Sequence, residues 1–202
     1  MVIAEEKVEL RKYFKRLRSQ LTAEQAASSS LLTARQILAC DAYRKANCIM
    51  GYLAFGNELS VDLVLQQALA DGKTVAVPLV QSATEMAPVQ LQNMLDFELD
   101  RYGIRSVRQP EKLLQPQQLD LVLVPGVAFG RDGSRLGMGA GYYDRFLPQA
   151  ENALLMGIAY DAFIQPSLPR DEFDVLVQLL ASESGITTLS PLSFCLLYTS
   201  PS

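Results

Sequence analysis

Residues 120–147 read DLVLVPGVAFGRDGSRLGMGAGYYDRFL, and this stretch decides the fold. After its first residue the run 120–124 is entirely apolar, which is typical of a strand buried on both faces of a parallel sheet. Residues 142–147 predict a short helix. Between them glycine recurs at every second position, at Gly137, Gly139 and Gly141. A buried strand, a glycine-rich loop and a helix in this order predict an α/β protein with a site in the loop.

Apolar runs and helical periodicity also occur in the sequence before and after this stretch. Further apolar runs predict strands at 48–53, 74–79, 154–160 and 175–180, with one more near Val89. Helical periodicity predicts helices over 5–21, from Thr22 to about Cys40, and from Ser60 through Ala70, where Gly72 ends the last of them. Thr22 and Gln25 have the form of a capping box. We therefore expect an α/β fold in a single domain, with a mostly parallel central sheet flanked by helices and two N-terminal helices. The domain is predicted over 1–187, and the uncharged stretch 188–202 is predicted to be a disordered or non-native tail.

Composition excludes several classes of protein. The chain has 202 residues, of which 49% are hydrophobic and 20% charged, so a single folded core is expected rather than disorder. A net charge of -4 argues against a dedicated nucleic-acid binder. The absence of histidine removes every His-dependent catalytic or metal site. The cysteines lack CxxC spacing, which favours a reducing, cytoplasmic setting. No apolar run is long enough to span a membrane. We also expect the protein to be a monomer.

The glycine-rich loop carries the clearest chemistry. Its alternating glycines can aim successive N–H groups into one concavity that binds an anion, and the following helix would begin at the same place. Arg135 and Arg145 bracket the loop with guanidinium groups suited to phosphate, and Asp144 could hold Mg²⁺. The pattern is neither a Walker A loop nor a dinucleotide fingerprint, because eleven residues separate Pro125 from Gly137. We therefore favour a mononucleotide-binding site. The alternative is a loop whose glycines only allow tight turns and bind no ligand.

Three further features could contribute to such a site. Lys7, Arg11 and Lys15 recur every four residues and share one helical stripe, which is either a phosphate clamp or a solvated helix face. Glu58 follows a predicted strand at its carboxyl end, where open α/β sheets bind their ligands, although it could equally be a carboxylate in a surface turn. Asp174 precedes the last predicted strand and could be a helix cap or an ion-pair partner.

The whole pattern resembles the 5-formyltetrahydrofolate cyclo-ligase family. The resemblance rests on RLGMGAGYYDRFL preceded by DLVLVPGVAFGRDG, on an N-terminal KxxLR, on a glutamate after the first strand and on the closing segment. It implies an ATP- and Mg²⁺-dependent ligase that converts 5-formyltetrahydrofolate, possibly polyglutamylated, to 5,10-methenyltetrahydrofolate, with release of ADP and phosphate. In the family's mechanism the formyl oxygen attacks the γ-phosphate, and N10 of the folate then attacks the activated carbon and expels phosphate.

The resemblance also implies roles for particular residues. The predicted ATP-binding residues are Lys7, Arg11, Arg135, Leu136, Gly137, Met138, Gly139, Ala140, Gly141, Tyr142 and Tyr143. The predicted Mg²⁺ ligands are Asp144 and Asp174. For the folate we expect Leu53, Glu58 and Tyr143, and for catalysis Arg145 and Tyr143.

The closing segment departs most from the family pattern. Phe173 stands where His is frequent, and Gln178 and Ser182 stand where Asp and Thr are common. Two alternatives to the cyclo-ligase therefore stay open. One is a catalytically idle module of the same fold that binds folate or nucleotide. The other is an α/β enzyme acting on a sugar phosphate or coenzyme A, against which the N-terminal KxxLR argues.

Overall fold

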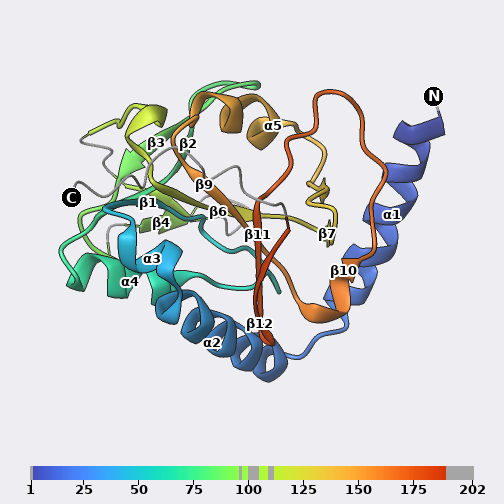
Figure 1. The fold of residues 1–202 in the computed structure, drawn as a ribbon, viewed down its shortest axis with the longest axis horizontal. Coiled ribbons are helices and arrows are strands. Elements are labelled where there is room, and N and C mark those ends of the chain that lie inside the picture. The colour runs from blue at the N-terminus through green and yellow to red at the C-terminus, as the bar shows by residue number, and fades with distance from the viewer. Residues whose placement is uncertain (1, 96, 100–104, 109–111, 190–202) are drawn as a thin grey trace, which may run out of the picture.

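The structure is a computed structural model that describes residues 2–95, 97–99, 105–108 and 112–189 (Figure 1). Its α-helices are α1 Val2–Ser19, α2 Ala23–Ala39, α3 Asp41–Lys45, α4 Asp62–Ala70 and α5 Tyr142–Phe146. Short 3₁₀ turns are η1 Pro116–Gln118, η2 Leu147–Gln149 and η3 Asp161–Phe163. The strands are β1 Cys48–Met50, β2 Thr74–Val80, β3 Met86–Gln90, β4 Phe97–Leu99, β5 Arg105–Val107, β6 Leu121–Pro125, β7 Ala128–Gly130, β8 Arg135–Leu136, β9 Leu154–Ile158, β10 Ile164–Gln165, β11 Leu179–Ser182 and β12 Gly185–Thr188.

The largest sheet in the described part of the chain has seven strands in the order β12-β11-β9-β6-β1-β2-β3. Its five inner strands pair in parallel, and β12 and β3 add antiparallel edges. Figure 1 shows α2, α3 and α4 on one side of this sheet and α5 on the other. The predicted fold class, an α/β domain with a mostly parallel sheet and two N-terminal helices, is confirmed.

Side chains of the central strands alternate between two apolar cores, one on each face. In β6, Leu121 and Leu123 belong to the core that α2 and α4 cover, whereas Val122 and Val124 belong to the core under α5. All four side chains are fully buried. Because both faces are covered, the strand needs apolar residues at every position, and this is why it reads as an unbroken apolar run.

The direction of the crossovers reverses between β1 and β6. From β1 the chain moves to β2 on one side, and from β6 it moves to β9 on the other side. At such a point the loops that leave the two strands diverge and open a crevice at the carboxyl ends of the strands. The loop after β1 carries Leu53 and Glu58, and the segment after β6 leads to the glycine-rich loop.

A hairpin of β7 and β8 brings the glycine-rich loop back to this crevice. Ala128 pairs with Leu136, and Gly133 makes the turn with φ +87. The N–H of Val127 donates to the carbonyl of Leu136 at 2.7 Å, so the end of β8 lies beside the end of β6. The strand β10 pairs with the outer side of β7. The sequence pattern predicts no regular structure for this hairpin.

The capping box at the start of α2 is confirmed. The Thr22 hydroxyl accepts from the Gln25 N–H at 3.2 Å, and the Thr22 N–H donates to the Gln25 side chain at 2.9 Å. These two bonds satisfy donors that have no partner inside the helix. They fix the point at which the chain leaves α1 and enters α2.

Thr22→Ala is expected to lower the free energy of unfolding by about 1 kcal/mol, because one helix N–H loses its acceptor. Urea denaturation with a constant m-value would measure this loss. Thr22→Ser keeps the acceptor and is the matched control. Equal destabilisation by both variants would contradict the capping role.

The last parallel strand begins later than expected. The sequence predicts a strand over 175–180, whereas β11 covers Leu179–Ser182. The Val177 N–H donates to the Gly133 carbonyl, and Asp174 accepts a hydrogen bond from Lys7 of α1. These residues before Gln178 therefore bond to other parts of the chain rather than to β9.

The predicted tail overlaps the end of the sheet. Thr188 pairs with Leu179, and the Leu189 N–H donates to the Gln178 carbonyl at 2.9 Å. The rest of the predicted tail, 190–202, lies outside the described residues. Within the part of the chain that the structure covers, no helix is long and apolar enough to cross a membrane.

Candidate active site

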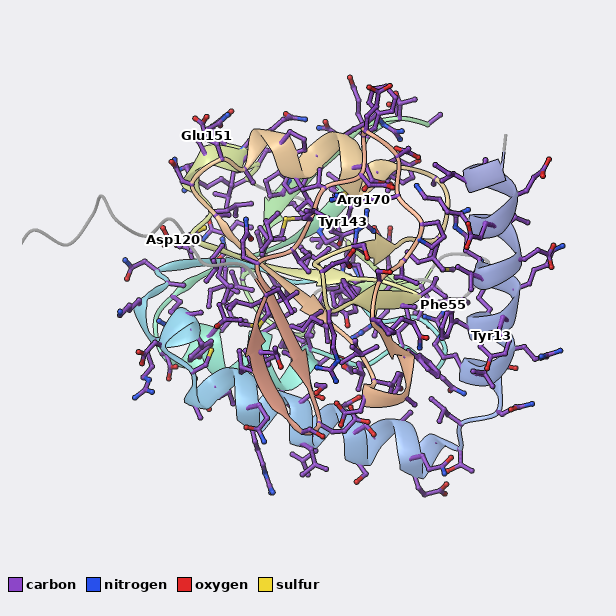
Figure 2. All side chains as sticks on the ribbon, turned by 45° about the vertical axis from the view of Figure 1, so that its right-hand side comes forward. Tyr13, Phe55, Asp120, Tyr143, Glu151 and Arg170 are labelled. Carbon is purple, nitrogen blue, oxygen red and sulfur yellow. The ribbon has the colours of Figure 1, made fainter. Side chains whose placement is uncertain are left out.

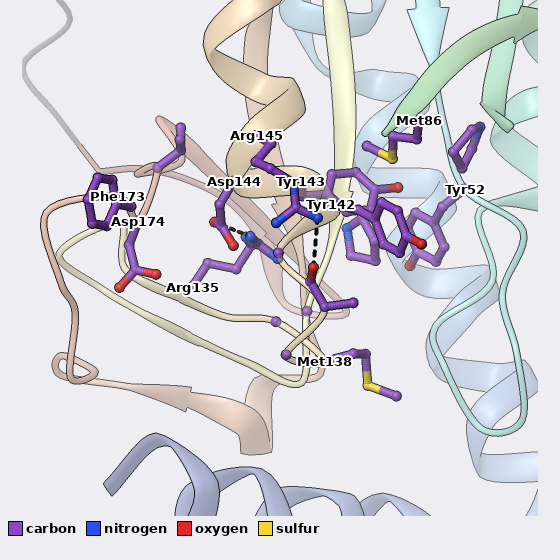
Figure 3. A pocket seen from close by; sticks show the side chains of 18 of the residues that line it. Tyr52, Met86, Arg135, Met138, Tyr142, Tyr143, Asp144, Arg145, Phe173 and Asp174 are labelled. Carbon is purple, nitrogen blue, oxygen red and sulfur yellow. Dashed lines mark hydrogen bonds and ion pairs between the residues drawn. The ribbon is translucent and has the colours of Figure 1, made fainter. Parts of the chain in front are cut away.

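A pocket of about 1260 Å³ lies at the carboxyl ends of the central strands, in the crevice between β1 and β6 (Figure 3). Side chains from α1, the loop after β1, the glycine-rich loop, α5 and the segment before β11 line it. Among the predicted site residues, all except Leu136 line this pocket. The Leu136 side chain is fully buried in the core instead.

The glycine-rich loop forms one wall of the pocket. Gly139 has φ +107 and Gly141 has φ +70, and both values lie in a region that L-residues rarely adopt. Gly141 is followed directly by α5, which has five residues. Two of the three alternating glycines therefore take a glycine-dependent conformation, whereas Gly137 does not have a positive φ.

Helix α1 lies against this loop. The Arg11 Nε donates to the Gly137 carbonyl at 2.8 Å, and Lys7 lines the same pocket with only 6% of its surface exposed. Phe14 holds the helix in place by packing against Phe163, with ring centroids 5.8 Å apart. Figures 1 and 2 both show α1 at one side of the molecule, beside β10. Lys7 and Arg11 of the basic stripe thus lie at the loop, whereas Lys15 is exposed and does not line the pocket.

Each predicted Mg²⁺ ligand is bonded to a predicted phosphate-binding cation. Arg135, 7% exposed, donates to the Asp144 carboxylate. Lys7 donates to Asp174 and, at 2.7 Å, to Asp171. Figure 3 shows Asp144 and Asp174 on the same side of the view, around Arg135. Cations and carboxylates therefore balance one another inside the pocket.

These ion pairs shift the pKa values of two of their members. Burial lowers the pKa of Lys7, but the hydrogen bonds that Lys7 donates to Asp171 and Asp174 outweigh it, and the net pKa is raised. The hydrogen bond from Lys7 lowers the pKa of Asp171. Both groups are charged at neutral pH. The pair is lost when Asp171 is protonated, at a pH below the ordinary range of a carboxyl group, or when Lys7 is deprotonated, at a pH above the ordinary range of a lysine.

Arg145 is held at the opposite end of the loop. Its Nε donates to the Thr84 carbonyl at 2.7 Å, and a terminal nitrogen donates to the Ala140 carbonyl at 2.8 Å. Its guanidinium lies over the Tyr142 ring, 5.6 Å from the centroid. These contacts tie the loop to the turn between β2 and β3.

Tyr52 and Tyr143 of the pocket are neutral hydroxyls at physiological pH. Burial raises the pKa of Tyr143, although Arg135 opposes the rise, and burial followed by the charge of Glu58 raises the pKa of Tyr52. Neither phenol can therefore serve as a general base. The buried Tyr143 hydroxyl has no hydrogen-bond partner among the described residues, so it can donate to a ligand if the side chain shifts.

Glu58 marks the other end of the pocket. One carboxylate oxygen accepts from Arg18 at 3.2 Å, and the other accepts from the Phe55 N–H at 3.1 Å. Leu53 and Tyr52 stand in the same wall. The pocket thus has a cationic, glycine-lined end and a largely apolar end with one carboxylate.

Sequence reasoning missed several of these residues. Asp171 lies three positions before Asp174, a weak signal because acidic residues at this spacing are common on surfaces. Arg18 and Tyr52 gave no signal of their own, since their contacts with Glu58 and with the pocket wall depend on the packing of distant segments.

The sheet topology and the pocket together define an α/β protein with a glycine-lined pocket at the carboxyl ends of its parallel strands. The model of the 5-formyltetrahydrofolate cyclo-ligase family matches residues 3–182. The chain therefore belongs to this family, and the predicted family and ligase class are confirmed.

Relatives in sequence and in structure agree with this assignment. A 5-formyltetrahydrofolate cyclo-ligase of Mus musculus is 30% identical over 182 residues, covering 84% of this chain and 89% of that protein. The NMR structure of a 5,10-methenyltetrahydrofolate synthetase from Aquifex aeolicus is similar with a TM-score of 0.80 and 28% identity, over 91% of this chain and 92% of that one. A synthetase of the same description from Mycoplasma pneumoniae is similar with a TM-score of 0.72 and 25% identity, over 88% and 99%.

Proposed function

We propose that this chain converts 5-formyltetrahydrofolate to 5,10-methenyltetrahydrofolate with ATP and Mg²⁺, releasing ADP and phosphate. The observation that carries the proposal is the contact of α1 with the glycine-rich loop. It brings Lys7 and Arg11 into the same pocket as Glu58. A triphosphate and a folate can thus lie in one pocket with their reacting groups facing each other.

The cationic end of the pocket suits the triphosphate. Lys7, Arg11 and Arg135 can each donate to phosphate oxygens, and the glycines allow backbone N–H groups to come close. Arg145 lies next to Ala140 and is placed to neutralise charge that develops on the transferred phosphoryl group. Binding and orienting the two reactants supplies most of the catalysis in such a transfer.

Mg²⁺ fits this donor set. Within the described residues, no group of three or more acidic, Cys or His side chains could hold a metal ion by itself. Asp144 and Asp174 are available as oxygen ligands, and Mg²⁺ commonly uses one or two carboxylates together with substrate phosphates and water. When bound it would neutralise charge on the phosphates.

The apolar end suits the folate. Leu53 and Tyr52 offer apolar contacts, and the Glu58 carboxylate can accept from the N–H groups on the edge of a pterin. If its side chain shifts, the buried Tyr143 hydroxyl can donate to a ligand in the pocket. We extend the proposal to polyglutamylated folates and to a cytoplasmic monomer, as the sequence predicts.

The reaction itself is the test. Purified protein mixed with 5-formyltetrahydrofolate, ATP and Mg²⁺ should show absorbance growing in the band of the methenyl product, with one ADP formed per product. Omission of ATP should abolish the signal. Binding of both ligands without product would instead indicate an idle module of the same fold.

Glu58→Gln is expected to raise the KM for the folate about 10-fold and to leave the KM for ATP within about 2-fold, because only the folate loses a charged acceptor. Steady-state kinetics with each substrate varied would measure both constants. An equal rise in the two KM values would show that Glu58 is structural.

A further inference from the structure

Glu58 is held by a residue that does not itself reach the ligand pocket. Arg18, in the last turn of α1, forms an ion pair with Glu58 at 3.2 Å, and the two side chains are only 12% and 16% exposed. The Phe55 N–H donates to the second carboxylate oxygen. Each oxygen can accept two hydrogen bonds, so one acceptor position on each remains for a ligand.

Of the described members of this ion pair, only Glu58 lines the main pocket. Glu58 lines both the main pocket and a small cavity of about 10 Å³ behind it. Arg18 lines the small cavity and is not among the described residues that line the main pocket. Arg18 therefore lies behind the carboxylate, and its direct contact with the wall of the main pocket is the ion pair with Glu58.

The backbone of this loop has supports of its own. The Asn57 side-chain amide donates to the carbonyl of Leu21 at 2.9 Å and to that of Arg18 at 3.3 Å. The Tyr160 hydroxyl donates to the Asn57 carbonyl at 2.9 Å. None of these bonds involves the Arg18 guanidinium. Its removal should therefore release the Glu58 carboxylate and leave the loop in place.

The ion pair is also a poor source of stability. Taking two charges out of water costs about as much as their attraction returns. What the guanidinium does supply is a fixed direction and a permanent positive charge behind the carboxylate. We propose that Arg18 is a positioning residue that holds the Glu58 carboxylate toward the folate. This proposal rests on the proposed function of Glu58.

The experiment compares Arg18→Gln, Arg18→Lys and Glu58→Gln with the unaltered chain. Calorimetric titrations would give the Kd of 5-formyltetrahydrofolate, and separately that of ATP with Mg²⁺. Arg18→Gln should raise the folate Kd about 10-fold with the ATP Kd within about 2-fold. Arg18→Lys, which keeps the charge, should recover part of the loss. Arg16→Gln is the matched control, because Arg16 is exposed on the same helix and does not line either cavity.

A double-mutant cycle separates positioning from general structural damage. In a Glu58→Gln background, Arg18→Gln should no longer raise the folate Kd, because the group it positions has gone. An unchanged folate Kd in Arg18→Gln, or equal losses in both backgrounds, would overturn the proposal. If Glu58→Gln itself leaves the folate Kd unchanged, the proposed role of Glu58 fails as well. Should Arg18→Gln not fold, Arg18→Lys and its cycle with Glu58→Gln decide the question.

Discussion

Asp144→Ala is expected to lower Mg²⁺-dependent turnover about 1000-fold while the protein stays folded. The Asp144 carboxylate lies in the first turn of α5, is 25% exposed and bonds to Arg135. The variant removes a proposed Mg²⁺ ligand and leaves the guanidinium of Arg135 without its ion-pair partner. Product absorbance followed across a Mg²⁺ titration would measure the loss, and thermal denaturation would show that the fold is retained.

Asp144→Asn separates the two effects. The amide can still accept a hydrogen bond from Arg135 but carries no charge to offer to a cation. If it is as inactive as Asp144→Ala, the charge is what matters, as the proposed metal site requires. Turnover close to that of the unaltered chain would remove Asp144 from the metal site and leave it as a partner of Arg135. Glu151→Ala is the control, because Glu151 is exposed and does not line the pocket.

Three ion pairs that line the pocket suggest how its charges rearrange when ligands bind. Arg135 is bonded to Asp144, and Lys7 is bonded to Asp171 and Asp174. In the proposed complex the cations turn to phosphate and two of the carboxylates turn to Mg²⁺. Binding would then exchange one set of charge pairs for another, and the carboxylate that loses its partner, Asp171, is 48% exposed and can be hydrated. ATP and Mg²⁺ are accordingly expected to bind together more tightly than either binds alone.

The parts of the fold that sequence could predict are those determined by local pattern. The apolar runs of β6 and β9, the capping box at Thr22 and the turn at Gly72 each depend on a few consecutive residues. The glycine-rich loop belongs to the same class, because only glycine fits its positive φ values at Gly139 and Gly141. Because the central strands are apolar at every position, we expect other elements to cover both faces of the sheet.

The pairing of charges could not be predicted in this way. Lys7 and Asp174 are 167 residues apart, and Arg18 and Glu58 are 40 residues apart. Each pairing depends on how α1 packs on the finished sheet, which the helix's own periodicity does not specify. The late start of β11 has the same origin, since Asp174 is held by α1 rather than by the neighbouring strand.

Lys7→Met is expected to raise the Kd of ATP about 100-fold, because a buried cation contributes a charge-assisted bond and its loss leaves two carboxylates facing the phosphates. Methionine keeps most of the side-chain volume, so the packing of α1 should change little. Calorimetric titration with ATP and Mg²⁺ would measure the affinity, and folate binding measured in the same way should stay within about 2-fold. Lys12→Met is the control, since Lys12 is exposed and pairs only with Glu9 in the structure as described.

Repulsion from the unpaired carboxylates can be tested directly in this background. Asp171 is the more exposed of the two partners of Lys7, at 48% against 14% for Asp174, and it is not a proposed metal ligand. Adding Asp171→Asn to Lys7→Met removes one negative charge and should therefore recover part of the ATP affinity, several-fold, without restoring the lost hydrogen bond. An ATP Kd unchanged by Lys7→Met would place the triphosphate elsewhere in the pocket. A double variant no tighter than Lys7→Met would mean that the lost bond alone, and not the exposed charge, accounts for the defect.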